Sequence, residues 1–313
     1  MAFYICKKCG HTQKTPDNKR SKTFNCPKCK KQENKVHANL VEGIKDIIHH
    51  YTTAPIKFNT AFTDKQEDYQ TISTWFQQHN IEITTDKNCN DSQSLFAQVG
   101  LIIGEQYDLL NRVVQQIKFS NNKGWHNTKY NVKKSSQKEI ATVTQFCSQL
   151  KRLTFVASYH YNKNNHAIHL RLLETASIKK FFNGDWFEWF VFMTVKNFFA
   201  KKKINVACLH NVELTLANED HHELDVFLLI DNRIPICIEC KSGEFANDIN
   251  KYQKISKIMN LDERQFMICS PNIRDHDADA LRGLHHLTFS SHAGLVNCLE
   301  NLLEDMYIPV GTE

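Results

Sequence analysis

The chain has 313 residues, of which 39 are Lys or Arg and 34 are Asp or Glu, so its formal net charge at neutral pH is only +5. With 41% hydrophobic residues it can bury one or two sizeable cores, which excludes a mainly disordered or low-complexity protein. Its longest aromatic stretch, residues 186–199, is too short and too charged to cross a bilayer, so no membrane is expected. Eleven cysteines without a secretory signal predict a reduced, cytoplasmic setting.

Four cysteines near the N-terminus have the spacing of a zinc site. Cys6 and Cys9 form one CxxC pair, and Cys26 and Cys29 form a second. Four thiolates at this spacing are typical of a structural zinc ribbon, in which every ligand position is filled and none is left for chemistry. Disulfides are the alternative, which a reduced setting disfavours. We therefore predict a Zn²⁺ ribbon at residues 1–36.

The predicted ribbon is strongly basic. It contains ten Lys and Arg residues against two acidic residues, Asp17 and Glu33. A basic module with little apolar content suits contact with the phosphates of a nucleic acid, which gives affinity but little choice of sequence. A solvated ribbon that docks on a partner protein is the alternative.

The middle of the chain, residues 37–150, is predicted to be mainly helical. Helices are expected over residues 64–80, 91–117 and 135–150, with an extended piece at 81–84, and Gly100 and Gly104 mark a candidate break in the second helix. Alternating residues then predict a hairpin within 153–174. Helices followed by a hairpin match a winged helix, and they also match additional elements of the domain that follows.

A nearly all-apolar segment, residues 184–199, predicts a helix that is buried on every side. Glu188 lies within it. A buried carboxylate is costly unless it is paired, hydrogen-bonded or bound to a metal. The alternative is a capping box, with Asp185 as the N-cap and Glu188 three residues later, and the two roles are compatible.

Two apolar runs, residues 223–230 and 234–240, predict a hairpin of buried strands joined by a turn at 231–233. Because side chains alternate between faces, Glu239 and Lys241 point the same way, and hairpin pairing brings Asp225 beside them. Asp225, Glu239 and the backbone carbonyl of Cys240 offer the oxygen ligands that Mg²⁺ or Mn²⁺ prefers, while Lys241 can orient or deprotonate a water or stabilise negative charge. The alternative is a strand that simply leaves the core into solvent.

The order of a helix with Glu188, a strand with Asp225 and a strand with Glu239 and Lys241 resembles the PD-(D/E)xK nuclease superfamily. The local sequences GDWFE, ELDV and IECKSG are most similar to the nuclease half of CRISPR-associated effectors that are activated by cyclic oligoadenylates through a linked CARF domain. The resemblance covers roughly residues 150–300. It implies that these four positions hold one or two divalent ions and activate water, and Leu224 stands where the family has a proline.

The resemblance also implies a polar or basic contact to phosphate from the next helix, residues 244–260, which carries Tyr252, Gln253 and Lys254. An ordinary amphipathic helix is the alternative. A strand at 265–269 and a helix at 293–306 then complete an α/β arrangement. The related effectors carry a Rossmann-like sensor, whereas this sequence lacks its opening strand and glycine loop, so regulation by a cyclic nucleotide is not expected.

Together these patterns predict an α/β protein with a restriction-endonuclease-like core, a mixed sheet flanked by helices, at residues 151–313. The expected function is a Mg²⁺- or Mn²⁺-dependent DNA endonuclease of prokaryotic anti-phage defence, acting as a homodimer and with a defence-system partner or activator. An RNA-cutting or single-strand-specific nuclease is one alternative. A catalytically inactive nucleic-acid-binding adaptor is the other.

Overall fold

The computed structural model describes the backbone of four short N-terminal strands and then residues 66–84, 91–216 and 219–307, with side chains from residue 66 onward except those of 91–93 and 305–307. The chain divides into two compact units, Met1–Phe58 and Asn59–Glu313. Each unit is described by itself.

The N-terminal unit contains two antiparallel hairpins. β1 (Ala2–Ile5) pairs with β2 (Thr12–Thr15), and β3 (Thr23–Asn25) pairs with β4 (Gln32–Asn34). Cys6 and Cys9 fall in the segment that connects β1 to β2, and Cys26 and Cys29 fall in the one that connects β3 to β4. All four cysteines lie outside the described residues, so the zinc ribbon stays a prediction.

The larger unit is built on a six-stranded mixed sheet in the order β13-β12-β11-β10-β9-β5. The pairs β5–β9, β9–β10 and β10–β11 are antiparallel, whereas the pairs β11–β12 and β12–β13 are parallel. The strands are β5 (Glu82–Ile83), β9 (Val206–Thr215), β10 (His221–Ile230), β11 (Ile234–Cys240), β12 (Phe266–Cys269) and β13 (Thr288–Ser290).

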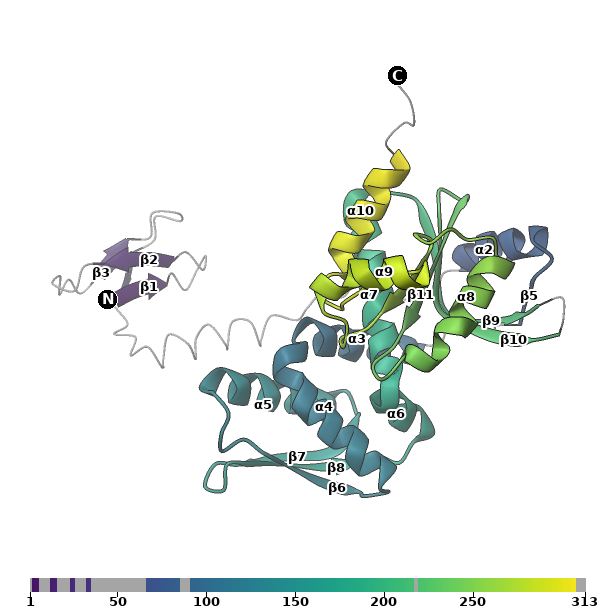
Figure 1. Ribbon diagram of the computed structural model, residues 1–313. Coiled ribbons are helices and arrows are strands. Elements are labelled where there is room, and N and C mark those ends of the chain that lie inside the picture. The colour runs from purple at the N-terminus through teal and green to yellow at the C-terminus, as the bar shows by residue number, and fades with distance from the viewer. Residues whose placement is uncertain are drawn as a thin grey trace. The chain divides into compact units, whose positions relative to one another are not determined.

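Helices cover both faces of this sheet (Figure 1), which is why its central strands are continuous apolar runs. Val226 and Ile238 contribute to a core with α3, α7 and α10, and Phe227 and Cys237 contribute to a second core with α2 and α8. The α/β fold with a mixed sheet flanked by helices is therefore confirmed. The helices are α2 (Gln66–Gln78), α3 (Asp91–Glu105), α7 (Trp186–Lys202), α8 (Ile249–Ile258), α9 (Ala278–His285) and α10 (Leu295–Tyr307).

A second, three-stranded antiparallel sheet has the order β6-β8-β7. The predicted hairpin is present as β7 (Val156–Asn162) and β8 (Ala167–Leu172), but the third strand, β6 (Asn127–Asn131), was not predicted. The helices α4 (Tyr107–Asn122) and α5 (Gln137–Arg152) lie on one face of this sheet (Figure 1). The domain boundaries at residues 36 and 150 stay predictions.

The expected break in the helix over 91–117 occurs at Gln106, between α3 and α4, and not at a glycine. Gly100 and Gly104 instead allow α3 to approach α7 closely. A Cβ added at Gly100 would lie 2.7 Å from Cβ of Trp189 and 2.8 Å from the carbonyl oxygen of Trp186, and one added at Gly104 would overlap the ring of Phe190. The glycines are thus a packing feature and not a helix break.

The segment before α7 is irregular. The short helix α6 (Ala176–Lys180) continues into η1 (Phe181–Asp185), a π-helical turn with a kink at Gly184. A Cβ at Gly184 would lie 3.4 Å from Oγ of Ser242, so this turn approaches the loop that follows β11. In the part of the chain that the structure describes, no helix is both long enough and apolar enough to cross a membrane.

Candidate active site

The hairpin of β10 and β11 brings two of the predicted carboxylates together. Its register pairs Val226 with Ile238, and one further step along the ladder places Asp225 opposite Glu239. The backbone N–H of Cys240 donates a 2.6 Å hydrogen bond to Oδ2 of Asp225, which fixes this carboxylate against the end of β11. The pairing expected from the sequence is therefore present.

Glu239 is almost completely buried, with 3% of its surface exposed. The Tyr252 hydroxyl of α8, which donates to Oδ2 of Asp248 at 3.5 Å, acts to lower the pKa of Glu239, but Oε1 of Glu239 has no partner among the described residues. Burial and the nearby Asp225 carboxylate raise the pKa of Glu239 well above its ordinary value, although Lys241 opposes this shift. Burial likewise raises the pKa of Asp225, to about 6. The charges of Lys241 and Lys251 thus offset the effect of burial on these two carboxylates only in part.

Lys241 follows β11 and lies on the α8 side of the sheet. Its Nζ is 3.5 Å from Oδ2 of Asp248 and 5.6 Å from the ring centroid of Tyr252. Burial lowers the pKa of Lys241, but the carboxylates of Asp225, Glu239 and Asp248 outweigh it, so the pKa is raised overall. Lys241 is therefore a cation at neutral pH.

Glu188 approaches from the opposite layer, on α7. Burial first, and then the charges of Asp225 and Asp185, raise its pKa to about 9. The charge of Asp225 thus acts on Glu188, on Glu239 and on Lys241, so the structure brings all four predicted residues into one electrostatic cluster. The capping box was wrong, because the side chain of Asp185 makes no capping hydrogen bond and lies instead 3.4 Å from Nζ of Lys180.

Three charged residues of this cluster were not predicted from the sequence. Glu223 raises the pKa of Asp225 and of Glu188, and its position two residues before Asp225, on the same strand face, was a usable signal. Lys180 opposes the raised pKa of Glu188, and Lys251 opposes those of Asp225 and Glu239. The two lysines act from α6 and from α8, and no local pattern marks either one.

His210 is a buried residue of β9 that the sequence analysis also missed. Its Nε2 is 3.7 Å from Oε2 of Glu188, and its ring lies 4.2 Å from that of Trp189 and 5.6 Å from that of Phe192, measured between centroids. Burial lowers the pKa of His210 to about 3, so its imidazole is neutral. A single histidine in an apolar strand does not indicate from the sequence that it will lie beside Glu188.

The residues of α8 that the resemblance singled out have partners within the protein. Tyr252 contacts Glu239, Nε2 of Gln253 donates to the carbonyl of His285 at 2.7 Å, and Lys254 pairs with Asp220 at 3.1 Å. Lys251 is the lysine of this helix whose charge acts on Asp225 and Glu239.

The described residues contain no cluster of three or more His, Cys, Asp or Glu side chains arranged to hold a metal ion. Asp225, Glu239 and the carbonyl of Cys240 form a smaller set of oxygen donors. This set fits a hard divalent cation, because Oε1 of Glu239 is buried without a partner and the nearby lysines offset the burial of both carboxylates only in part. The thiol of Cys240 does not fit, since burial raises its pKa well above the ordinary value and keeps it protonated.

Comparisons with known proteins agree with this geometry. Residues 175–269 match the family described as the Card1-like endonuclease domain, and this segment contains Glu188, Asp225, Glu239 and Lys241. The resemblance to CARF-linked PD-(D/E)xK nucleases is therefore confirmed for this segment. No curated protein sequence matches the chain significantly.

Two solved structures share the fold. Protein VC1899 from Vibrio cholerae is 18% identical with a TM-score of 0.51. Can2 from Sulfobacillus thermosulfidooxidans, solved in complex with cyclic tetra-adenylate, is 14% identical, also with a TM-score of 0.51. Each alignment covers 74% of this chain but only 60% of the other protein.

Proposed function

We propose that the chain is a metal-dependent nuclease that hydrolyses phosphodiester bonds, and that its substrate is DNA. The observation that carries this proposal is the cluster itself: two facing carboxylates on paired strands, a third from α7 and a cationic lysine, within the segment that matches an endonuclease domain. Prokaryotic anti-phage defence follows from the resemblance to CRISPR-associated effectors.

Asp225, Glu239 and the carbonyl of Cys240 would hold Mg²⁺ or Mn²⁺, and Glu188 would support the site from α7. A bound ion polarises the phosphoryl oxygen and lowers the pKa of a bound water. Such an ion would give the buried Oε1 of Glu239 the partner it lacks and would favour the ionised form of both carboxylates.

Lys241 would stabilise the negative charge that builds up on the phosphoryl group and orient the attacking water. Its raised pKa argues against a role as a general base, since a lysine that keeps its proton cannot accept another. Lys180 and Lys251, which act on the cluster from α6 and α8, would attract the phosphates of the substrate.

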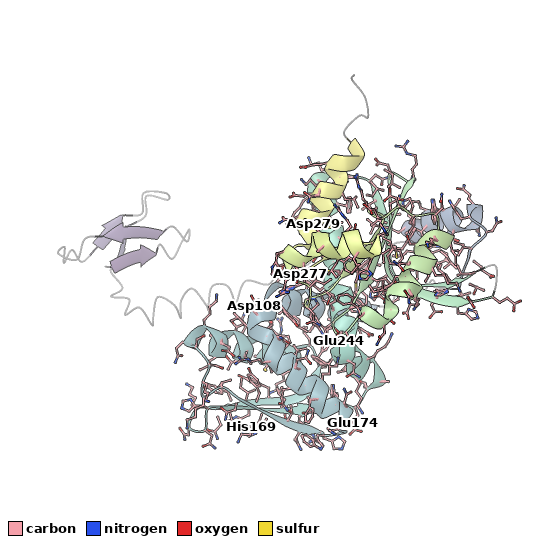
Figure 2. The ribbon with its side chains drawn as sticks, in the orientation of Figure 1. Asp108, His169, Glu174, Glu244, Asp277 and Asp279 are labelled. Atoms are coloured by element: carbon pink, nitrogen blue, oxygen red, sulfur yellow. The ribbon has the colours of Figure 1, made fainter. Side chains whose placement is uncertain are left out.

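The test is an incubation of the purified protein with supercoiled plasmid, single-stranded DNA and single-stranded RNA, each in Mn²⁺, in Mg²⁺ and in EDTA. We expect metal-dependent cutting that falls by about a hundredfold or more in Asp225→Ala, because this variant lacks a metal ligand. Asp279→Ala is the matched control, because Asp279 is an exposed carboxylate of α9, labelled in Figure 2. Cutting that persists in EDTA or in Asp225→Ala would refute the proposal, and the substrate that is cut separates DNA from RNA.

Cutting both strands of a duplex needs two sites, so we propose a homodimer, which light scattering on the purified protein tests. An activator or partner of the defence system is part of the proposal.

A further inference from the structure

The three-stranded sheet has one face that the fold leaves open. Tyr130, Ile168 and Leu170 are buried beneath α4 and α5, whereas the alternate positions of β6 and β8 are exposed. In Figure 1, α4 and α5 lie on one face of this sheet, and no described helix covers the other. His169, labelled in Figure 2, belongs to the exposed set, in the central strand.

The open face is basic. The register aligns Lys129 of β6, His169 of β8 and His160 of β7 across the three strands, so neighbouring side chains are about 5 Å apart. Arg171 is exposed two residues further along the central strand. None of the residues in β6, β7 or β8 is acidic. Such a face is complementary to a row of phosphates.

An aromatic pair lies at the end of this sheet, where the chain passes from α4, on the covered face, to β6. Phe119 and Trp125 are 47% and 52% exposed, which is unusual for such large side chains, and their rings meet edge to face at 5.5 Å. Nζ of Lys123 is 5.9 Å from the Phe119 ring centroid. Exposed aromatic rings next to cations are the features on which proteins stack the bases of single strands.

The same end of α4 is connected to the candidate active site. Nζ of Lys118 donates a 2.6 Å hydrogen bond to the carbonyl of Asn183 in η1, the turn that leads directly into α7 and Glu188. Gly184 of this turn approaches Ser242, just beyond Lys241. A chain of contacts therefore runs from the catalytic cluster through η1 to α4 and on towards the aromatic pair.

We propose that the open face of the β6-β8-β7 sheet, together with Trp125, is a second binding surface for the nucleic acid that the active site cuts. Lys129 and Arg171 contact phosphates, and Trp125 stacks on an unpaired base. The surface supplies affinity for the strand beyond the scissile bond without reading its sequence. The inference rests on the proposed function for the identity of the bound polymer.

The test measures binding of the full chain in EDTA, so that no strand is cut. The probes are a fluorescein-labelled 30-nucleotide single strand and the matching duplex, followed by fluorescence anisotropy from 50 to 200 mM NaCl. For Lys129→Ala/Arg171→Ala we expect binding weakened on the order of tenfold at the lowest salt. The slope of log K against log salt should be smaller by about 2, one for each phosphate that the variant no longer neutralises. Arg233→Ala/Lys257→Ala is the matched control, since it removes two exposed cations elsewhere on the same unit.

Trp125 gives an independent readout. Trp125→Ala should weaken binding of the single strand on the order of tenfold, and Trp125→Phe should restore most of it, because a base stacks on either ring. The proposal would be overturned if Lys129→Ala/Arg171→Ala bound with the same affinity and salt slope as the wild type and the control. It would also be overturned if the control lost as much affinity as this variant. Weaker binding by these variants, together with cutting that persists in EDTA or in Asp225→Ala, would refute the metal-dependent nuclease and leave the surface standing. Metal-dependent cutting with unchanged binding would do the reverse.

Discussion

At the scale of single residues, the candidate site concentrates acidic side chains whose pKa values are raised by burial first and then by neighbouring carboxylates. Glu188 shows the consequence most directly, because its folded-state pKa is about 9 against an ordinary value of 4.5. Without a cation, the folded protein holds this proton where the unfolded chain releases it. The resulting stabilisation is fully present below pH 4.5 and is lost as the pH rises towards 9.

This linkage predicts that Glu188→Gln gains thermal stability relative to the wild type as the pH rises from 5 to 9 in EDTA. Because 1 kcal/mol corresponds to roughly 2–4 °C in a domain of this size, we expect the difference in Tm to change by several degrees. Glu244→Gln, at an exposed position in the loop after β11 (Figure 2), is the control. Scanning calorimetry that gives parallel curves for wild type and Glu188→Gln would contradict the prediction.

His210 is predicted to be a positioning residue for Glu188. His210→Ala should lower stability by roughly 2–4 kcal/mol because it leaves a cavity between Trp189 and Phe192. His210→Phe should keep most of the stability, but should slow cutting by about tenfold, because Oε2 of Glu188, now 3.7 Å from the polar Nε2, would then face an apolar ring carbon. Thermal melts and initial rates in Mn²⁺ separate the two effects. If His210→Phe cut at the wild-type rate, His210 would contribute only to packing and would not position Glu188.

At the scale of elements, the contact between α3 and α7 determines where Glu188 stands. Gly100→Ala should lower the Tm by several degrees although alanine favours helices, because the added Cβ meets the backbone carbonyl of Trp186, which cannot move aside. Gly283→Ala in α9 meets nothing within 4 Å and should instead stabilise by about 0.5–1 kcal/mol. Thermal melts of the two variants test these expectations. An unchanged Tm in Gly100→Ala would contradict the first, because it would mean that α7 moves away from the added Cβ without loss of stability.

Elements with strong local patterns were predictable from the sequence, and those defined by distant contacts were not. The apolar runs around Asp225 and Glu239 specified the hairpin and hence the facing carboxylates. The strand β6 has only five residues and the helix α9 only eight, so neither offers a pattern long enough to be recognised without the neighbours it packs on. Lys180 and Lys251 reach the site from separate helices, which only the tertiary fold brings together.

At the scale of the whole molecule, the two compact units are predicted to depend on different metals. The four cysteines of the N-terminal unit would bind Zn²⁺ through thiolates, with an apparent free energy of roughly 10–16 kcal/mol. The carboxylate site offers few oxygen donors and would release Mn²⁺ or Mg²⁺ readily.

A brief treatment with EDTA, followed by desalting, should therefore abolish cutting while about one zinc per chain remains, and added Mn²⁺ should restore the rate. Plasma mass spectrometry of the desalted protein measures the zinc, and plasmid cleavage measures the activity. In Cys9→Ser/Cys26→Ser the zinc should be absent, whereas Cys147→Ser, at a buried cysteine of α5, is a control that should keep it. Cysteines that pair as disulfides would give no zinc in the wild type and two fewer free thiols for each bridge, which thiol titration under denaturing conditions would reveal.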